Sequence, residues 1–362
     1  MLLLSQISFL LSAAVIATTP PIRAVHSGSQ QGIVMWYPDE VNCEAGTFPQ
    51  AEELLRPFNT TTYTLEEEPA PASLTFAIDD TGRPHSIDFA NGSSQTFADA
   101  PAALAGSRFR AGASARNCTI SYEARTATFE QAPFAELISL SISPEGRRPP
   151  KKVWERIYGS SECMKPPRPR QLVRVMPDFA KIPGKTGARD WTLIGFDIDE
   201  EGRTQTPKVI ATTGSLALDE AGIQAVDQSR FAEGAAKTGC LNPFWRNPLR
   251  LAAPHRPEGD SPCVDLPDWD WSPNLRYPNA FQRRLIEGWA LIRYDVASWG
   301  ETGNVEVIDA QPASAFGAAA MQMMQRAKYK AGGEGAIGCT TLVAYVLPEE
   351  DGTLSDVPEG AE

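Results

Sequence analysis

The chain repeats one short motif three times, as SRFRAGASARNC at 107–118, SRFAEGAAKTGC at 229–240 and AKYKAGGEGAIGC at 327–339. Each copy has an aromatic residue, then small residues with glycine, then a cysteine. That cysteine follows an earlier one at spans of 75, 77 and 76 residues, in the pairs Cys43/Cys118, Cys163/Cys240 and Cys263/Cys339. A shared motif and a shared period together indicate an internal repeat, so we interpret the chain as three copies of one unit.

Each unit begins with a strand in which apolar and polar side chains alternate, which is typical of a sheet with one buried face. The apolar positions are Leu74, Phe76 and Ile78 in the first unit, Ile194, Phe196 and Ile198 in the second, and Ile292, Tyr294 and Val296 in the third. A turn with glycine, a second strand, a helix expected to begin at Asp99, Asp219 or Ser314, and a last strand follow. The sequence therefore predicts an α+β fold of three tandem small domains, each a strand–hairpin–strand–helix–strand unit with a three-stranded antiparallel sheet and one helix.

The boundaries of the units follow from proline-rich lead-in segments, each of which carries the first cysteine of a pair. In the second unit Pro243 follows Cys240, so the last strand should be interrupted or lie at a sheet edge, because proline donates no ladder hydrogen bond. The end of the chain is acidic and poor in apolar residues, which predicts disorder. We place a degenerate first unit at 32–135, the second at 153–255, the third at 258–347 and the acidic tail at 348–362.

The N-terminus predicts export. Residues 1–17 are apolar and uncharged and end in Val15-Ile16-Ala17, a small-residue cleavage pattern. This pattern is typical of a secretory signal peptide, which we place within 1–24 with cleavage after Ala17. The alternative is an uncleaved anchor, which would be the chain's route to membrane contact.

The cysteines also favour a compartment outside the cytoplasm. Disulfides persist in oxidising compartments, and the repeat selects pairing within units among the pairings that six cysteines allow. Zinc binding is the alternative, but the chain has no CxxC string and its histidines are scattered. The net charge of −12 argues against a nucleic-acid partner, because such proteins neutralise phosphates with basic side chains.

We expect no enzyme activity, no metal and no cofactor. Catalysis needs a nucleophile or an acid–base pair held by a supporting group, and no GxSxG, HExxH, P-loop or SxxK string occurs. Disulfide formation would also remove the cysteines from nucleophilic roles.

The third unit resembles the C-terminal domain of TonB, the periplasmic end of a bacterial energy-transducing system. Order and spacing match through Arg276-Tyr277-Pro278, Ile286-Glu287-Gly288, the strand Trp289 to Val296, Asn304 to Ile308, Gln311-Pro312, Phe316, Arg326 and Tyr329. The second unit matches more loosely, and the first keeps only the strand, the turn glycine and Arg108-Phe109. The resemblance implies a location in the periplasm, reached by secretion through the inner membrane.

In that family the domain captures an extended peptide of an outer-membrane receptor by adding it to a sheet edge, where main-chain groups supply hydrogen bonds. The resemblance implies envelope proteins as partners here, among them TonB-dependent receptors. The implied peptide-binding edge is Thr341, Leu342, Val343, Ala344 and Tyr345, with Tyr277 and Pro278 beside it. A proline at Val343 should then abolish capture and leave the fold nearly intact. The alternative is that this strand is an ordinary sheet member or packs against another repeat.

The chain departs from the family pattern in several respects. It has no long proline-rich stalk, and its N-terminus does not predict a membrane-spanning helix that could contact a proton-driven motor. Each unit has an additional cysteine pair, and Ala327 occupies a position where the family usually has tryptophan. These departures favour a non-enzymatic peptide-binding protein over an energy transducer for TonB-dependent outer-membrane transport. A cell-wall-binding or hydrolytic module is a further alternative, through the aromatic lead-in residues Trp269 and Trp271.

Overall fold

The structure is a computed structural model. It describes residues 31–348 except 45, 48–50, 64, 66–68, 91–98, 113, 144–147, 258–262, 264–265 and 272–273. The expected signal peptide and the acidic tail beyond Pro348 lie outside the described residues. Within the described part, no helix is long and apolar enough to cross a membrane.

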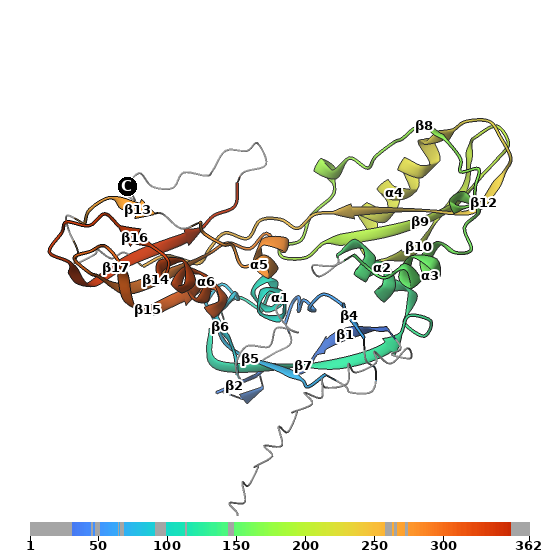
Figure 1. Ribbon diagram of the computed structural model, residues 1–362. Helices are drawn as coiled ribbons and strands as arrows, with labels where there is room; N and C mark the ends of the chain where they lie inside the picture. The colour runs from blue at the N-terminus through green and yellow to red at the C-terminus, as the bar shows by residue number, and fades with distance from the viewer. Residues whose placement is uncertain are drawn as a thin grey trace, which may run out of the picture.

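The same order of elements occurs in each of the three segments, as a hairpin, a helix and a last strand (Figure 1). In the first unit these are β5 (Ala72–Ile78), β6 (Pro84–Phe89), α1 (Ala100–Gly106) and β7 (Ala115–Thr128). In the second they are β9 (Asp190–Ile198), β10 (Thr204–Thr212), α4 (Leu216–Gln228) and β12 (Lys237–Arg246). In the third they are β14 (Gly288–Val296), β15 (Thr302–Gln311), α6 (Ser314–Met324) and β17 (Ala336–Tyr345).

Shorter elements lead into and connect the units. A small ladder joins each of the last two lead-ins to the residues after the helix: β8 (Gln171–Val173) pairs with β11 (Arg230–Phe231), and β13 (Trp269–Trp271) with β16 (Lys328–Tyr329). In the first unit a single bridge between Glu53 and Arg108 takes this place. The remaining helices are α2 (Phe134–Ile142), α3 (Lys151–Tyr158), α5 (Asn279–Arg283) and the 3₁₀ turns Glu162–Met164 and Phe179–Lys181.

In each unit the first strand of the hairpin (β5, β9 or β14) is the middle strand of the sheet. It pairs antiparallel with the second hairpin strand on one side and with the last strand on the other. The second and third units form three-stranded sheets in the orders β10-β9-β12 and β15-β14-β17, as predicted. The first unit differs, because its sheet has seven strands. The additional members are β1 (Gly32–Pro38), β2 (Asn42–Cys43), β3 (Gly46–Thr47) and β4 (Thr60–Thr62).

The repeated motif is explained by one tight contact at the hairpin turn. Gly82, Gly202 and Gly300 have φ angles of +81°, +77° and +90°. A Cβ at any of them would collide with the carbonyl oxygen of the aromatic residue in the motif, which is Phe109, Phe231 or Tyr329. Only glycine fits there, and each aromatic amide in turn donates to the carbonyl of its glycine at 2.8–3.0 Å.

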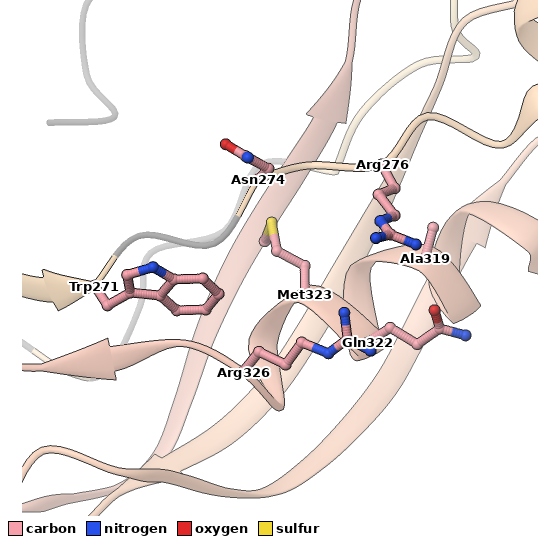
Figure 2. A pocket seen from close by; sticks show the side chains of 7 residues that line it. All are labelled: Trp271, Asn274, Arg276, Ala319, Gln322, Met323 and Arg326. Atoms are coloured by element: carbon pink, nitrogen blue, oxygen red, sulfur yellow. The ribbon is translucent and has the colours of Figure 1, made fainter.

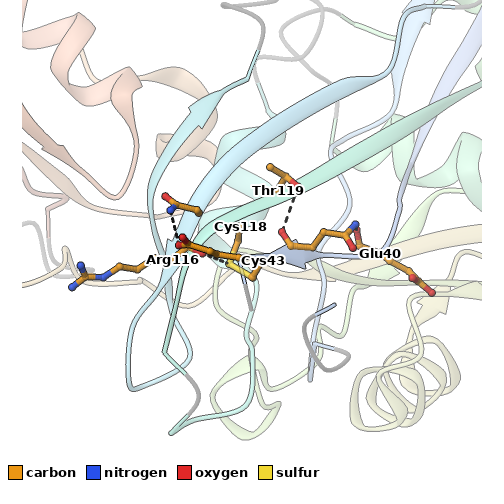
Figure 3. Close-up of a disulfide and its surroundings, with 8 residues drawn as sticks. Glu40, Cys43, Arg116, Cys118 and Thr119 are labelled. Carbon is orange, nitrogen blue, oxygen red and sulfur yellow. Dashed lines mark hydrogen bonds between the residues drawn. A yellow bond between two sulfur atoms is a disulfide. The ribbon is translucent and has the colours of Figure 1, made fainter. Parts of the chain in front are cut away.

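The structure links the six cysteines in the three predicted pairs. Each second cysteine lies on the last strand directly opposite the aromatic residue of the middle strand, in the pairs Phe76/Cys118, Phe196/Cys240 and Tyr294/Cys339. Figure 3 shows the bond between Cys43 and Cys118, where β2 lies beside β7. The bond therefore ties a lead-in to the start of a last strand, as the spacing predicted.

The apolar core does not divide into three separate parts. One cluster runs through the first and third units and includes Trp36, Tyr122 and Phe316. A second cluster joins β1 and α2 to Trp191 and neighbouring residues of β9, and a third belongs to the second unit alone. The expectation of three small domains is thus modified, because the units bury apolar surface against one another.

A buried arginine, Arg284, directly follows α5, which lies beside α1 in Figure 1, and it contacts all three units. Arg284 is 1% exposed, and its Nε donates to Asp99 Oδ1 at 3.0 Å in the first unit. Its other nitrogens donate to the carbonyl oxygens of Gly187 at 2.8 Å and Arg56 at 2.9 Å. Its guanidinium also lies 4.0 Å from the ring centroid of Phe58. Breaking such a buried pair by removing one partner is strongly destabilising, because the other charge stays buried.

The helix starts differ in part from those predicted. Asp219 lies within the first turn of α4 and is buried, rather than preceding the helix. Ser314 is the first residue of α6, and its hydroxyl donates to Asp88 Oδ1 of the first unit at 2.7 Å. Asp99 precedes α1, but its carboxylate accepts from Arg284 instead of the helix amides. The side chains of Asp99 and Ser314 thus contact another unit instead of capping their own helices.

Candidate functional site: the outer edge of β17

The predicted peptide-binding strand lies at one end of its sheet. β17 pairs with β14 from Gly288/Tyr345 to Val296/Ala336, and it pairs with no second strand among those that the structure describes. The strand begins at Ala336, five residues before the predicted edge residues Thr341 to Tyr345. An end strand leaves alternate amide and carbonyl groups directed away from its partner, where another strand can bind them.

The first unit shows which residues of the last strand direct their main chain outward. Ser121 of β7 lies opposite Ser73 of β5, yet its carbonyl oxygen accepts from the amide of Asp39 at 2.8 Å on the other side. Ser121 is three residues after Cys118, as Leu342 is after Cys339. Because the pattern alternates, Leu342 and Ala344 direct their main chain outward, and Val343 directs its main chain toward β14.

The side chains alternate in the same way. Val343 is 8% exposed and Tyr345 is fully buried, both on the face covered by α6. Leu342 is 36% exposed on the opposite face. Of the predicted edge residues, Leu342 and Ala344 could therefore pair with an added strand, whereas Thr341, Val343 and Tyr345 belong to the pairing with β14.

This arrangement changes the expected effect of a proline at Val343. The amide of Val343 faces Ala290 of β14, so proline there would remove a ladder hydrogen bond and disturb the sheet. The proline substitution that tests the edge is therefore at Leu342, one residue earlier than the sequence indicated. Proline at that position would remove an outward amide and leave the pairing with β14 in place.

Tyr277 and Pro278 lie at the far end of the strand. The Tyr277 hydroxyl donates to the carbonyl of Ile286 at 2.7 Å and lies 3.5 Å from the carbonyl oxygen of Tyr345. Burial, with the Glu287 carboxylate nearby, raises the pKa of Tyr277 above its ordinary value, so the hydroxyl stays a donor. Pro278 precedes α5. Tyr277 and Pro278 therefore lie beside the edge and support the end of β17.

The same edge is covered in the first unit. β1 lies antiparallel along β7 from Gly32/Thr128 to Pro38/Tyr122, and Asn42 of β2 pairs with Thr119. The occupant is a segment of this chain, and its Trp36 is 1% exposed. Sequence reasoning missed this pairing, although the apolar run at 33–36 was a signal for a buried strand.

In the second unit no described strand covers the outer edge of the last strand, but that edge carries a proline. β12 is the end strand of its sheet, as Pro243 predicted, and Pro243 lies opposite Leu193. Pro243 is three residues after Cys240, which is the position of Leu342 in the third unit. Since proline has no N–H, this edge lacks the donor that Leu342 offers. Counting from the cysteines could have revealed this from the sequence.

Across the described residues, no group of three or more His, Cys, Asp or Glu side chains could hold a metal ion. The outer face of the sheet carries the ion pair of Arg293 with Glu306 and the 47% exposed Ile308. The outward main-chain groups of β17 could therefore form hydrogen bonds with an added strand. The apolar and charged side chains on the outer face of the sheet could contact the side chains of that strand.

Comparison with known proteins places the similarity on the third unit. A family model described as Gram-negative bacterial TonB protein C-terminal matches residues 273–346. Protein TonB of Salmonella typhimurium is 30% identical over 116 residues, which are 30% of this chain and 46% of that protein. The chain thus matches about half the length of this curated relative. The segment that contains α5, β14, β15, α6 and β17 is therefore similar to the C-terminal domain of TonB.

Proposed function

We propose that this is a periplasmic, non-enzymatic binding protein whose third unit captures an extended peptide of an envelope protein by strand addition to β17. The observation that carries the proposal is the outward main chain of Leu342 and Ala344 at the end of a TonB-like sheet. The similarity to TonB, the disulfides and the predicted signal peptide support a location in the periplasm. TonB-dependent receptors are the proposed partners.

The proposal includes three tandem copies of the unit, at 32–135, 153–255 and 258–347. The backbone supports this beyond the order of elements. Four residues after each turn glycine, Ser86, Thr206 and Asn304 have positive φ angles of 51°, 48° and 49°. The residue before each second cysteine, Asn117, Gly239 or Gly338, also has a positive φ, of 50°, 64° or 71°. Positive φ angles are uncommon at residues other than glycine, and their recurrence at matching places is expected when one backbone has been duplicated.

Strand addition at this edge would give modest affinity. Each hydrogen bond contributes about 0.5–1.5 kcal/mol net, and the open part of the edge is short. Selectivity would come from alternate side chains of the peptide, which would lie beside Leu342 on one face and above the disulfide-tied lead-in on the other. Such a site fits transient capture of one partner after another.

The test compares two substitutions of Leu342 in the full chain. Leu342→Pro removes the outward amide, and Leu342→Ala removes only side-chain atoms. Synthetic peptides from the periplasmic segments of TonB-dependent receptors serve as probes in a calorimetric titration. We expect about a 2- to 10-fold loss of affinity for Leu342→Pro and a smaller loss for Leu342→Ala, with melting temperatures close to that of the parent chain.

Two results would refute the proposal. One is equal binding by Leu342→Pro and the parent chain, which would place the peptide elsewhere. The other is the absence of binding by every receptor peptide in the panel. Val343→Pro is the matched contrast, because it should lower the melting temperature itself.

Energy transduction is a second candidate, favoured by the similarity to Protein TonB. It requires residues 1–17 to remain attached in the inner membrane and to contact a motor complex. Crosslinking from residues 1–17 in intact cells, followed by sequencing of the mature N-terminus, separates the candidates. A mature chain that begins after Ala17 excludes this role.

Cell-wall binding is a third candidate, favoured by the exposed lead-in tryptophans. Trp269 and Trp271 are 42% and 53% exposed. The ring of Trp269 already stacks on Tyr329 at 4.1 Å, so Trp271 is the freer surface. Sedimentation with purified sacculi tests this candidate, and Trp271→Ala should abolish any binding that occurs there.

A further inference from the structure

A small cavity of about 170 Å³ lies between the lead-in of the third unit and α6. Arg276 and Trp271 line it from the lead-in, and Gln322, Met323 and Arg326 line it from the helix and the turn that follows (Figure 2). Its lining residues belong to the lead-in, to α6 and to the turn after α6, and none of them belongs to β17. The TonB-like strand pairing does not use it.

The charge of this cavity is unusual for the chain. Two guanidinium groups line it and no carboxylate does, although the whole chain has a net charge of −12. Neighbouring cations of the same unit do have carboxylate partners: Arg293 pairs with Glu306, and Lys330 with Asp268 at 2.9 Å. Among the described residues, neither Arg276 nor Arg326 forms an ion pair.

We infer that this cavity binds a carboxylate attached to a short apolar group. Guanidinium groups bind carboxylates through paired, charge-assisted hydrogen bonds, which are among the stronger polar contacts in proteins. The amide of Gln322 can donate a further hydrogen bond. Trp271 and Met323 supply an apolar surface for the rest of the ligand. The volume limits the bound part to about the size of one amino-acid side chain.

The carboxylate could come from either of two sources. Arg276 precedes Tyr277, whose hydroxyl lies 3.5 Å from the carbonyl oxygen of Tyr345 at the end of β17. A peptide bound along β17 could therefore bring an acidic residue to the cavity. The chain itself also continues from this point with Glu349, Glu350 and Asp351. The chemistry is the same in both cases.

The test uses phenylpropionate and its neutral isostere phenylpropionamide as probes of the full chain, followed by protein NMR titration. We expect phenylpropionate to bind and phenylpropionamide to bind at least about 10-fold more weakly, because the amide lacks the charge. Arg276→Gln and Arg326→Gln should each weaken phenylpropionate binding by at least about 10-fold. Arg293→Gln, which alters an exposed arginine on the other face, is the matched control and should have no effect.

Further variants identify the source of the carboxylate and separate this inference from strand capture. If Glu349→Gln/Glu350→Gln/Asp351→Asn strengthens phenylpropionate binding, the chain's own acidic residues compete for the site, and unchanged binding assigns it to an external ligand. Leu342→Pro should leave phenylpropionate binding unchanged, so failure of strand capture and failure of this site are distinguishable. The inference is overturned if both probes bind equally, if neither binds, or if the two arginine variants behave like the parent chain.

Discussion

The outer edge of the last strand is covered in the first unit and open in the third. In the first unit β1 lies along β7, with Ile33 and Met35 in one core and Val34 and Trp36 in another. In the third unit the corresponding main chain at Leu342 and Ala344 has no strand beside it in the described part of the chain. The fold therefore shows a strand added along β7 and, among the described residues, none added along β17.

The difference shows what an occupant of each edge needs. β1 is buried on both faces, so it consists of consecutive apolar residues. An occupant of β17 would be buried mainly on one face, because Leu342 faces solvent. We therefore expect its ligand to alternate apolar and polar residues rather than to copy β1. The second unit, with Pro243 at the corresponding position, is the intermediate case.

The largest effect is expected at the contact that joins the covered and the open unit. Asp99→Ala leaves the Arg284 charge buried without its partner, which should lower the free energy of unfolding by about 3–5 kcal/mol. Denaturant unfolding of the full chain measures the loss. Asp270→Ala, at an exposed lead-in aspartate, is the control and should change it by less than about 0.5 kcal/mol. Similar values for the two variants would contradict the role of this contact.

The second-largest effect is expected for substitution of an isoleucine on β1, compared with an isoleucine on β17. Ile33 of β1 is fully buried, and Ile337 of β17 is 86% exposed. Ile33→Ala should therefore lower the free energy of unfolding by about 2–5 kcal/mol, through lost burial and the cavity left behind. Ile337→Ala should change it by less than about 0.5 kcal/mol. Unfolding curves of both variants decide the point, and a small loss for Ile33→Ala would mean that β1 is not held on β7.

A smaller effect is expected when the second edge is opened. Pro243→Ala restores an outward amide on β12, which adds one hydrogen bond worth about 0.5–1.5 kcal/mol, or about 2- to 10-fold in affinity. In a Leu342→Pro background, this substitution should restore part of the peptide binding measured by titration. Pro183→Ala, in an exposed loop, is the control. Without any gain for Pro243→Ala, the proline would not be what distinguishes the two edges.

The smallest effect concerns pH and the hairpin turns. Burial alone would raise the pKa of Asp79, but hydrogen bonds from Thr81 and Arg83 outweigh it and hold the pKa below the ordinary value. Because the folded-state pKa is lowered, the stabilisation is present above the unfolded-state pKa near 3.8 and is lost as the pH falls through the folded value. The third unit has Ala297 at this place.

Thermal unfolding between about pH 5 and pH 3 checks this prediction. The parent chain should lose stability over this range more steeply than Asp79→Ala, since that variant has lost the titrating group. Ala297→Asp is the reciprocal variant and should steepen the dependence. Identical slopes for all three chains would show that the turn carboxylates do not contribute.

Much of the fold was predictable because its signals are local. The alternation around Phe76, Phe196 and Tyr294 predicted the middle strands, and the turn glycines predicted the hairpins. The cysteine spacing predicted the disulfide pairing. The helix starts were less predictable, because Asp99 and Ser314 contact another unit instead of their own helix.

The strand that carries the candidate site was predictable as a segment, but the direction in which each of its residues turns its main chain was not. The resemblance indicated the strand around Val343, and the family match covers it. It did not indicate which residues direct their main chain outward, and it favoured Val343 for a proline substitution. The correct position for the proline depends on which alternate residues of β17 direct their amides away from β14. The hydrogen bond from the amide of Asp39 to the carbonyl oxygen of Ser121 in the first unit shows this alternation.

The sequence by itself determined the element order, the cysteine pairs and the position of each last strand, because periodicity, turn chemistry and spacing are properties of short segments. Only the tertiary structure decided which edge is covered, because that depends on β1 reaching a strand about 90 residues further along the chain. It also decided how the units join, since Arg284 and Asp99 are 185 residues apart and meet only after packing.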